Sequence, residues 1–150
     1  MDLKSLFYAL FIALIMSSSL QAERSSKTDK YLSILIKRPS SDYLFDKFYS
    51  SWLENATGAD LESFLDEKFT ETQNPIYQQI KAYYLEAEGS NHDALDIYNA
   101  IISTQSSASL LFRRAKLQMG TLEFEKAIAD LKAASALSDK EKLTIQINKL

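Results

Sequence analysis

The chain has 150 residues, of which 46% are hydrophobic and 25% are charged, and these values are ordinary for one modest folded domain. It contains no cysteine, which excludes disulfides, thiolate metal sites and a cysteine nucleophile. Its single histidine cannot form a histidine-rich metal site. The net charge is −3, and residues 39–100 hold twelve acidic side chains against three basic ones. This acidic stretch argues against DNA or RNA as a partner, because nucleic-acid binding depends on neutralising phosphates.

Residues 1–22 have the pattern of a signal peptide. Lys4 precedes an uncharged run over residues 6–16, and the small side chain of Ala22 suits a cleavage site. The run is shorter than the roughly 20 residues that a membrane-spanning helix needs. We therefore expect export to the periplasm or cell envelope. An uncleaved membrane anchor is the main alternative, because Leu20 extends the apolar stretch.

Residues 23–40 are expected to form a linker and a short lead-in segment. The first part, residues 23–29, is polar and has no apolar periodicity. Residues 31–36 are mostly apolar and predict a brief helix or strand. That element should end near Arg38, because the residue before Pro39 is pushed out of the helical region.

Beyond residue 40, short breaks separate segments whose apolar residues recur at helical spacing. Only three Gly and two Pro are present in the chain, which leaves few natural sites for tight turns. An imperfect capping box, Thr57 with Asp60, marks the start of one helix. Pro75 follows Asn74 and suits the first turn of a helix. Other helix starts are expected at residues with capping side chains, which are Ser41, Asn74, Asn91, Ser107 and Ser138. These patterns predict an all-α fold of stacked antiparallel helical hairpins.

Two of these hairpins share a pattern of small residues. Ala82 and Ala94 are twelve residues apart, and so are Ala115 and Ala127, with an offset of 33 between the two pairs. A small residue on each helix lets the two helix axes approach closely. Each hairpin alone leaves one apolar side uncovered, so stacking on a neighbour is expected.

The two hairpins resemble the tetratricopeptide (TPR) repeat family, whose period is about 34 residues. The resemblance covers roughly residues 75–137 and implies a right-handed superhelix. Gln78 and Lys81 depart from it, because the family prefers large apolar residues there, and Gly120 falls early. The stretch 38–69 also resembles the N-terminal lead-in of large exported repeat proteins of planctomycete- and verrucomicrobia-like bacteria. The residues that carry the TPR resemblance are Ala82, Gly89, Ala94, Tyr98, Ala115, Phe124, Ala127, Leu131 and Ala134.

The expected division after the lead-in has four parts. Residues 41–73 form a degenerate N-terminal helical hairpin, and residues 74–106 and 107–138 form TPR-like repeats 1 and 2. Residues 139–150 form the first helix of an incomplete repeat or a cap. The apolar residues of this last segment have no second helix to cover them, which predicts either a fragment of a longer array or self-association through the C-terminal end.

The TPR resemblance implies that the first helix of each pair lines a concave peptide-binding groove. Mapped onto this sequence, the groove residues are Gln79, Tyr83, Glu86, Phe112, Lys116 and Met119. The residues expected to pack the repeats are Ala82, Ala94, Tyr98, Ala115, Ala127 and Leu131. The alternative for Tyr83 and Phe112 is a place in the interface between hairpins.

No pattern of residues indicates catalysis. Neighbouring acids such as Asp66 and Glu67 point to different faces of a helix and do not converge on one substrate atom. We therefore expect a non-enzymatic scaffold without cofactor or metal, which mediates protein–protein interaction or assembly in the cell envelope. Two alternatives remain: the N-terminal scaffold of a larger enzyme, and a membrane-tethered structural protein.

Overall fold

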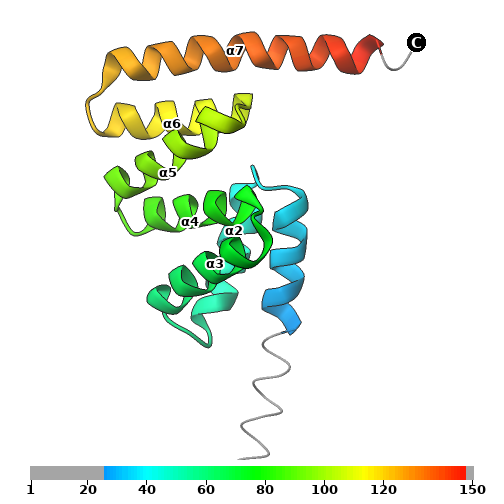
Figure 1. Ribbon diagram of the computed structural model, residues 1–150, viewed down its shortest axis with the longest axis vertical. Coiled ribbons are helices and arrows are strands. Elements are labelled where there is room, and N and C mark those ends of the chain that lie inside the picture. The colour runs from blue at the N-terminus through cyan, green and yellow to red at the C-terminus, as the bar shows by residue number, and fades with distance from the viewer. Residues whose placement is uncertain (1–25, 148–150) are drawn as a thin grey trace, which may run out of the picture. The chain divides into compact units, whose positions relative to one another are not determined.

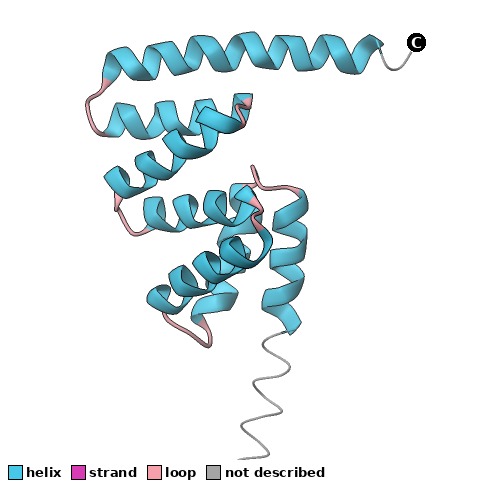
Figure 2. Ribbon diagram, viewed as in Figure 1, coloured by secondary structure: helices cyan, strands magenta, loops and turns pink. Residues whose placement is uncertain are grey.

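The computed structural model describes residues 26–147, and every regular element among them is a helix (Figures 1 and 2). The all-α prediction is therefore confirmed. The expected signal peptide, residues 1–22, lies outside the described residues. No helix within residues 26–147 is both long and apolar enough to cross a bilayer. A helix over residues 26–37 comes first. It is followed by α2 (Asp42–Leu53), α3 (Gly58–Thr72), α4 (Pro75–Ala87), α5 (Asn91–Thr104), α6 (Ala108–Gly120) and α7 (Phe124–Ile147).

The chain divides into two compact units, Met1–Leu61 and Glu62–Leu150. In the first unit, the helix over residues 26–37 begins inside the segment that was expected to be a linker. The linker prediction is wrong from residue 26 onward, because this helix packs through buried polar and apolar side chains. Thr28 is buried, and its hydroxyl lies 2.8 Å from the hydroxyl of Ser51 on α2. Leu35 and Phe48 supply fully buried apolar side chains in this unit.

Most helices begin at the capping residues that the sequence indicates. The hydroxyl oxygen of Ser41 accepts a hydrogen bond from the Leu44 amide, and that of Ser107 accepts one from the Leu110 amide, both at 3.3 Å. Asn74 caps α4 in the same way, with Pro75 in the first turn. These caps satisfy amides that have no partner inside the helix.

The capping box at the start of α3 is complete although it uses Asp in place of Glu. The Thr57 amide donates to Asp60 Oδ2 at 2.9 Å, and the Asp60 amide donates to Thr57 Oγ1 at 3.2 Å. The Thr57 hydroxyl also donates to Asp60 Oδ2, and these bonds hold the pKa of Asp60 below its ordinary value. The two reciprocal bonds fix where α3 begins.

Two expected helix starts are wrong. Asn91 is the first residue of α5, while Ser90 occupies the capping position without a side-chain bond. Ser138 does not begin a helix, because it lies inside α7, which runs without a break from Phe124 to Ile147. No Gly or Pro stands between residues 121 and 150, and Ala133, Ala134 and Ala136 favour continuation of the helix. The boundary expected between residues 138 and 139 is therefore not a helix boundary.

The helix starts repeat with a constant interval. The first residues of α2, α4 and α6 are Asp42, Pro75 and Ala108, which are separated by the same offset as the two alanine pairs. The first residues of α3, α5 and α7 (Gly58, Asn91 and Phe124) follow this offset too. We call it the repeat interval. The sequence shows it in two alanine pairs, and the structure extends it to three pairs of helices.

In the second unit, α4 packs on α5, α5 on α6, and α6 on α7. Figure 1 shows these helices in this order, joined by short connections. Ala82, Ala94 and Ala115 are fully inaccessible to solvent, and Ala127 is nearly so. Because these side chains are small, each lets its helix approach the neighbouring helix closely.

The turns that end α4 and α6 have the same backbone hydrogen bonds, one repeat interval apart. After α4, the Ser90 amide donates to the Leu85 carbonyl at 2.8 Å, around Gly89 with φ +79°. After α6, the Glu123 amide donates to the Gln118 carbonyl at 2.8 Å, around Leu122 with φ +66°. Leucine therefore occupies a left-handed position at which the preceding turn has glycine.

We expect Leu122→Gly to raise the free energy of unfolding by about 0.5–1 kcal/mol, because glycine adopts positive φ without the steric cost that leucine bears. Leu122 is 74% exposed, so little buried apolar surface is lost. Gly89→Ala should lower the free energy by a similar amount. Urea unfolding followed by circular dichroism measures both changes. A loss of stability in Leu122→Gly would show that the two turns are not equivalent.

Candidate functional site

Three of the predicted groove residues form an exposed stripe on α6. Phe112 is 59% exposed and Met119 is 51% exposed, and exposed Lys116 stands between them. Their spacing of four and three residues places them on one face of the helix. We call these three residues the α6 stripe. Ala115, Leu111 and Leu117 face the core instead.

The other three predicted groove residues lie on α4 and do not form an open surface. Gln79 and Tyr83 are buried, and the side-chain amide of Gln79 donates to the Tyr83 hydroxyl. The guanidinium carbon of Arg113 lies 3.7 Å from the centroid of the Tyr83 ring, a cation–π contact between α6 and α4. The alternative place for Tyr83, within an interface between helices, matches this arrangement.

Glu86, the last of the six, joins three helices. Its Oε1 accepts a hydrogen bond from Arg113 Nε at 2.9 Å and another from the Tyr98 hydroxyl. Burial of Tyr98, followed by the charge of Glu86, raises the pKa of this phenol far above its ordinary value. Tyr98 therefore stays protonated and donates to the carboxylate, which links α4, α5 and α6. The TPR resemblance does not indicate Arg113, because the role of this residue depends on a partner that is distant in the sequence.

Five of the six predicted packing residues are buried, and the exception is on the last helix. Tyr98 is completely buried on α5, whereas Leu131, one repeat interval later on α7, is 36% exposed. Leu95 is buried, whereas Ile128, at the equivalent position of α7, is 52% exposed. The difference has a physical cause: α6 packs on α5, and among the described residues no helix occupies the equivalent place on α7.

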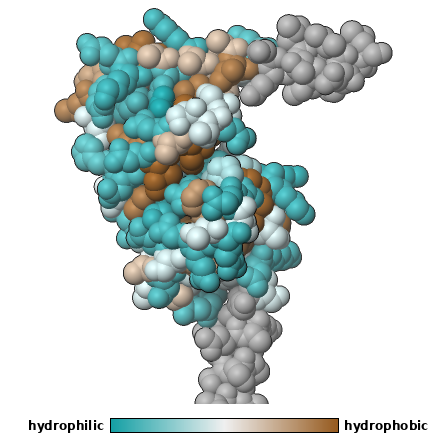
Figure 3. Space-filling view, viewed as in Figure 1, coloured by the Kyte–Doolittle hydropathy of each residue, from teal (hydrophilic) through white to brown (hydrophobic). Residues whose placement is uncertain are grey.

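Phe124 is 53% exposed and lies on the same side of α7 as Ile128 and Leu131, at spacings of four and seven residues. We call these three residues the α7 stripe. Figure 3 shows apolar surface over the α7 region at the top of the view, interrupted by hydrophilic side chains. Exposed apolar side chains gathered on one face are typical of an interaction surface.

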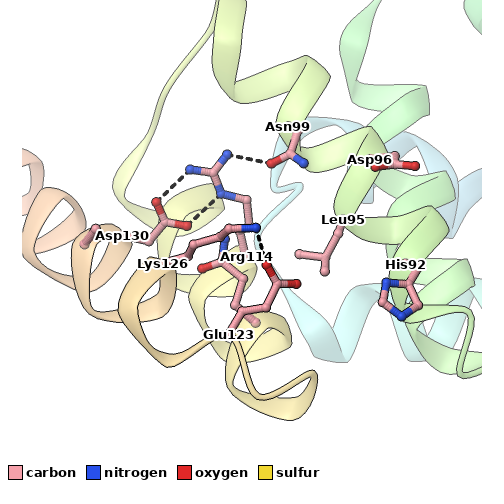
Figure 4. A pocket seen from close by; sticks show the side chains of 10 residues that line it. His92, Leu95, Asp96, Asn99, Arg114, Glu123, Lys126 and Asp130 are labelled. Carbon is pink, nitrogen blue, oxygen red and sulfur yellow. Dashed lines mark hydrogen bonds and ion pairs between the residues drawn. The ribbon is translucent and has the colours of Figure 1, made fainter.

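A polar pocket of about 490 Å³ lies between α5, α6 and α7. Arg114 stands at one end and donates to both carboxylate oxygens of Asp130 at 2.6 Å and to Asn99 Oδ1 at 2.9 Å (Figure 4). Lys126 pairs with Glu123 nearby, and His92 and Asp96 line the pocket from α5.

Two carboxylates of this pocket are engaged by cationic side chains. Asp130 is paired with Arg114 in a bidentate contact. The hydrogen bond from Lys126 lowers the pKa of Glu123, which keeps this carboxyl group ionised near neutral pH. Within the described residues, no group of three or more His, Asp or Glu side chains is placed to hold a metal ion.

Gln118 is an unusual residue in the wall of the pocket. It is buried one repeat interval after Leu85, which is also buried, so an amide stands where the preceding pair has an aliphatic side chain. Its Oε1 is inaccessible and has no hydrogen-bond partner among the described residues. A buried acceptor without a partner costs about 1–3 kcal/mol.

Comparison with protein-family models, with curated proteins and with solved structures finds no match for this chain.

We expect Gln118→Leu to raise the free energy of unfolding by about 1 kcal/mol, because it replaces an unpaired buried amide with the side chain found in the preceding pair. Urea unfolding at pH 7 measures the change, and Gln105→Leu on an exposed position serves as the control. A decrease in stability would show instead that water in the pocket satisfies the amide oxygen.

Tyr98 should make stability fall at high pH. Its pKa in the folded state lies above the ordinary value of 10.0, so unfolding above about pH 10 releases a proton that the folded protein retains. The stabilisation is complete below pH 10 and is lost as pH rises further. Tyr98→Phe should be less stable by about 1–2 kcal/mol at pH 7, since it loses a hydrogen bond to a charged group. It should also lose less stability between pH 9 and 11 (roughly the range of tyrosine ionisation). Tyr43→Phe, at an exposed position, should follow the unmodified protein in urea unfolding across this range.

Proposed function

We propose that this protein is an exported, TPR-like scaffold that binds another protein in the cell envelope and catalyses no reaction. The constant repeat interval of the helix starts and the repeated turn geometry support a repeat architecture. The signal-peptide pattern of residues 1–22 supports export.

The observation that carries this proposal is the α6 stripe. Phe112 and Met119 are large apolar side chains that remain more than half exposed, although the same helix buries Leu111 and Ala115. Transfer of such side chains from water to a partner is favourable by about 25 cal/mol for each Å² buried. The stripe therefore has an energetic reason to bind an apolar surface.

The positive charge of Lys116 favours a partner with an acidic group. It is exposed at the centre of the stripe and makes no ion pair among the described residues. A peptide with two apolar side chains and an acidic group between them would complement the stripe. Lys116 alone supplies less charge than a multi-residue carboxylate clamp, so the apolar contacts should dominate the affinity.

Several charged residues of the second unit pair with residues on another helix. Glu86 and Arg113 connect α4 with α6, and Arg114 and Asp130 connect α6 with α7. Lys81 pairs with Glu62 and Asp66 on α3. These pairings support a scaffold in preference to an enzyme.

Site-specific cross-linking in cells tests this proposal. A photoreactive residue at position 112 or 119 should form the same cross-linked protein product in the envelope fraction, and Lys116→Glu should reduce its yield several-fold by repelling an acidic partner. The same probe at Tyr43, which is also an exposed aromatic residue, is the matched control.

Identical products from positions 43, 112 and 119, or no product from 112 and 119, would contradict the proposal. The free energy of unfolding of each variant should remain within about 0.5 kcal/mol of the unmodified protein, because positions 43, 112, 116 and 119 are all exposed.

A further inference from the structure

We propose that two copies of this chain associate through α7, each α7 stripe packing antiparallel on the α7 stripe of the other about a twofold axis. This surface is formed by Phe124, Ile128 and Leu131 and is separate from the α6 stripe. The inference therefore does not depend on the proposed function.

The first argument is continuity with the α5–α6 interface. On α5, Leu95 and Tyr98 are buried, and this helix packs on both α4 and α6. The helix α6 follows α5 after a short connection and runs in the opposite direction (Figure 1). The equivalent side of α7 carries Ile128 and Leu131, so an antiparallel helix with an apolar face is the occupant that reproduces this interface. A second α7 provides such a face.

The second argument is the charge along one edge of the α7 stripe. Glu125 and Lys132 are both exposed, and neither has a partner among the described residues. They are seven residues apart and follow Phe124 and Leu131 directly, which places both on the same edge of the stripe. The opposite edge carries Ala127 and Ala134, which are buried.

In an antiparallel helix pair, an edge meets the same edge of the other helix in reversed order. Glu125 of one copy then lies beside Lys132 of the second copy, and Lys132 lies beside Glu125 of the second copy. Ile128 comes near Leu131 of the second copy in the apolar centre. The α7 stripe thus matches a second copy of itself in both its apolar centre and its charged edge, as a twofold interface requires.

The area of the stripe sets the strength of the dimer. Three partly exposed apolar side chains and their flanking charges offer less than the roughly 800 Å² per partner that stable interfaces bury. We therefore expect a weak dimer that dissociates with a Kd of about 0.1–1 mM.

Charge reversal tests the arrangement by sedimentation of the purified protein at several concentrations and low salt. Glu125→Lys and Lys132→Glu each replace two attractive pairs of the dimer with two repulsive ones, so each should raise the Kd about ten-fold. An equimolar mixture of the two variants should associate at least as well as the unmodified protein, because all pairs are again opposite in charge. The double variant should recover association in the same way.

Two controls separate this surface from general effects of charge and folding. Asp93→Lys reverses a charge on an exposed residue of α5 and should leave the Kd unchanged. Ile128→Asp should abolish the dimer while the circular dichroism spectrum stays helical, since Ile128 is exposed in the single chain. A protein that remains monomeric at about 1 mM overturns the proposal, and so does a dimer whose Kd does not respond to Glu125→Lys and Lys132→Glu. Either result leaves cross-linking at positions 112 and 119 as an independent test of the scaffold function.

Discussion

In a stack of helical hairpins, the second helix of each hairpin has two sides to bury, and its own hairpin partner can cover only one of them. In the second unit, α5 lies between α4 and α6, and its Leu95 and Tyr98 are buried. Among the described residues, α7 packs mainly on α6, and its Ile128 and Leu131 remain partly exposed. This requirement of stacked helical hairpins explains why these residues of α5 are buried within the second unit while α7 keeps an open apolar face.

Polar contacts specify how the helices stack. The carboxylate of Glu86 receives bonds from Tyr98 and Arg113, so the three helices that supply these residues must be in register. Removal of one partner from this partly buried carboxylate leaves it with fewer compensating bonds, which lowers stability. Arg114 and Asp130 have the corresponding role between α6 and α7. We infer that these charged groups limit the alternative ways in which the helices could pack.

Much of the fold could be predicted from the sequence, because the signals for helices are local. The caps at Ser41, Asn74 and Ser107 depend on hydrogen bonds within three residues, and the two alanine pairs depend on spacing along a hairpin. The predictions failed where distant contacts or the absence of a helix stop decided the outcome. Thr28 lies in a helix and contacts Ser51, which is distant in the sequence, and α7 continues past Ser138.

The candidate site was less predictable than the fold, because exposure depends on which helix lies above a residue. Equivalent positions of α4 and α6 have the same place in the repeat pattern, yet Gln79 and Tyr83 are buried and Phe112 and Lys116 are exposed. No periodicity of the sequence distinguishes these two cases. The unpaired oxygen of Gln118 is also invisible in the sequence, since a glutamine on a helix is ordinarily a solvated residue.

Native-state hydrogen exchange is the most direct test of the claim that cover by a neighbouring helix controls the stability of each element. It should be measured at a protein concentration low enough to keep the chain monomeric. The account predicts that amides of α5 from Leu95 to Ile101 exchange only through global unfolding, and that amides of α7 from Ile128 to Ala134 exchange through a smaller, local opening. Equal protection of the two segments would contradict it, because α7 would then be as well covered as α5.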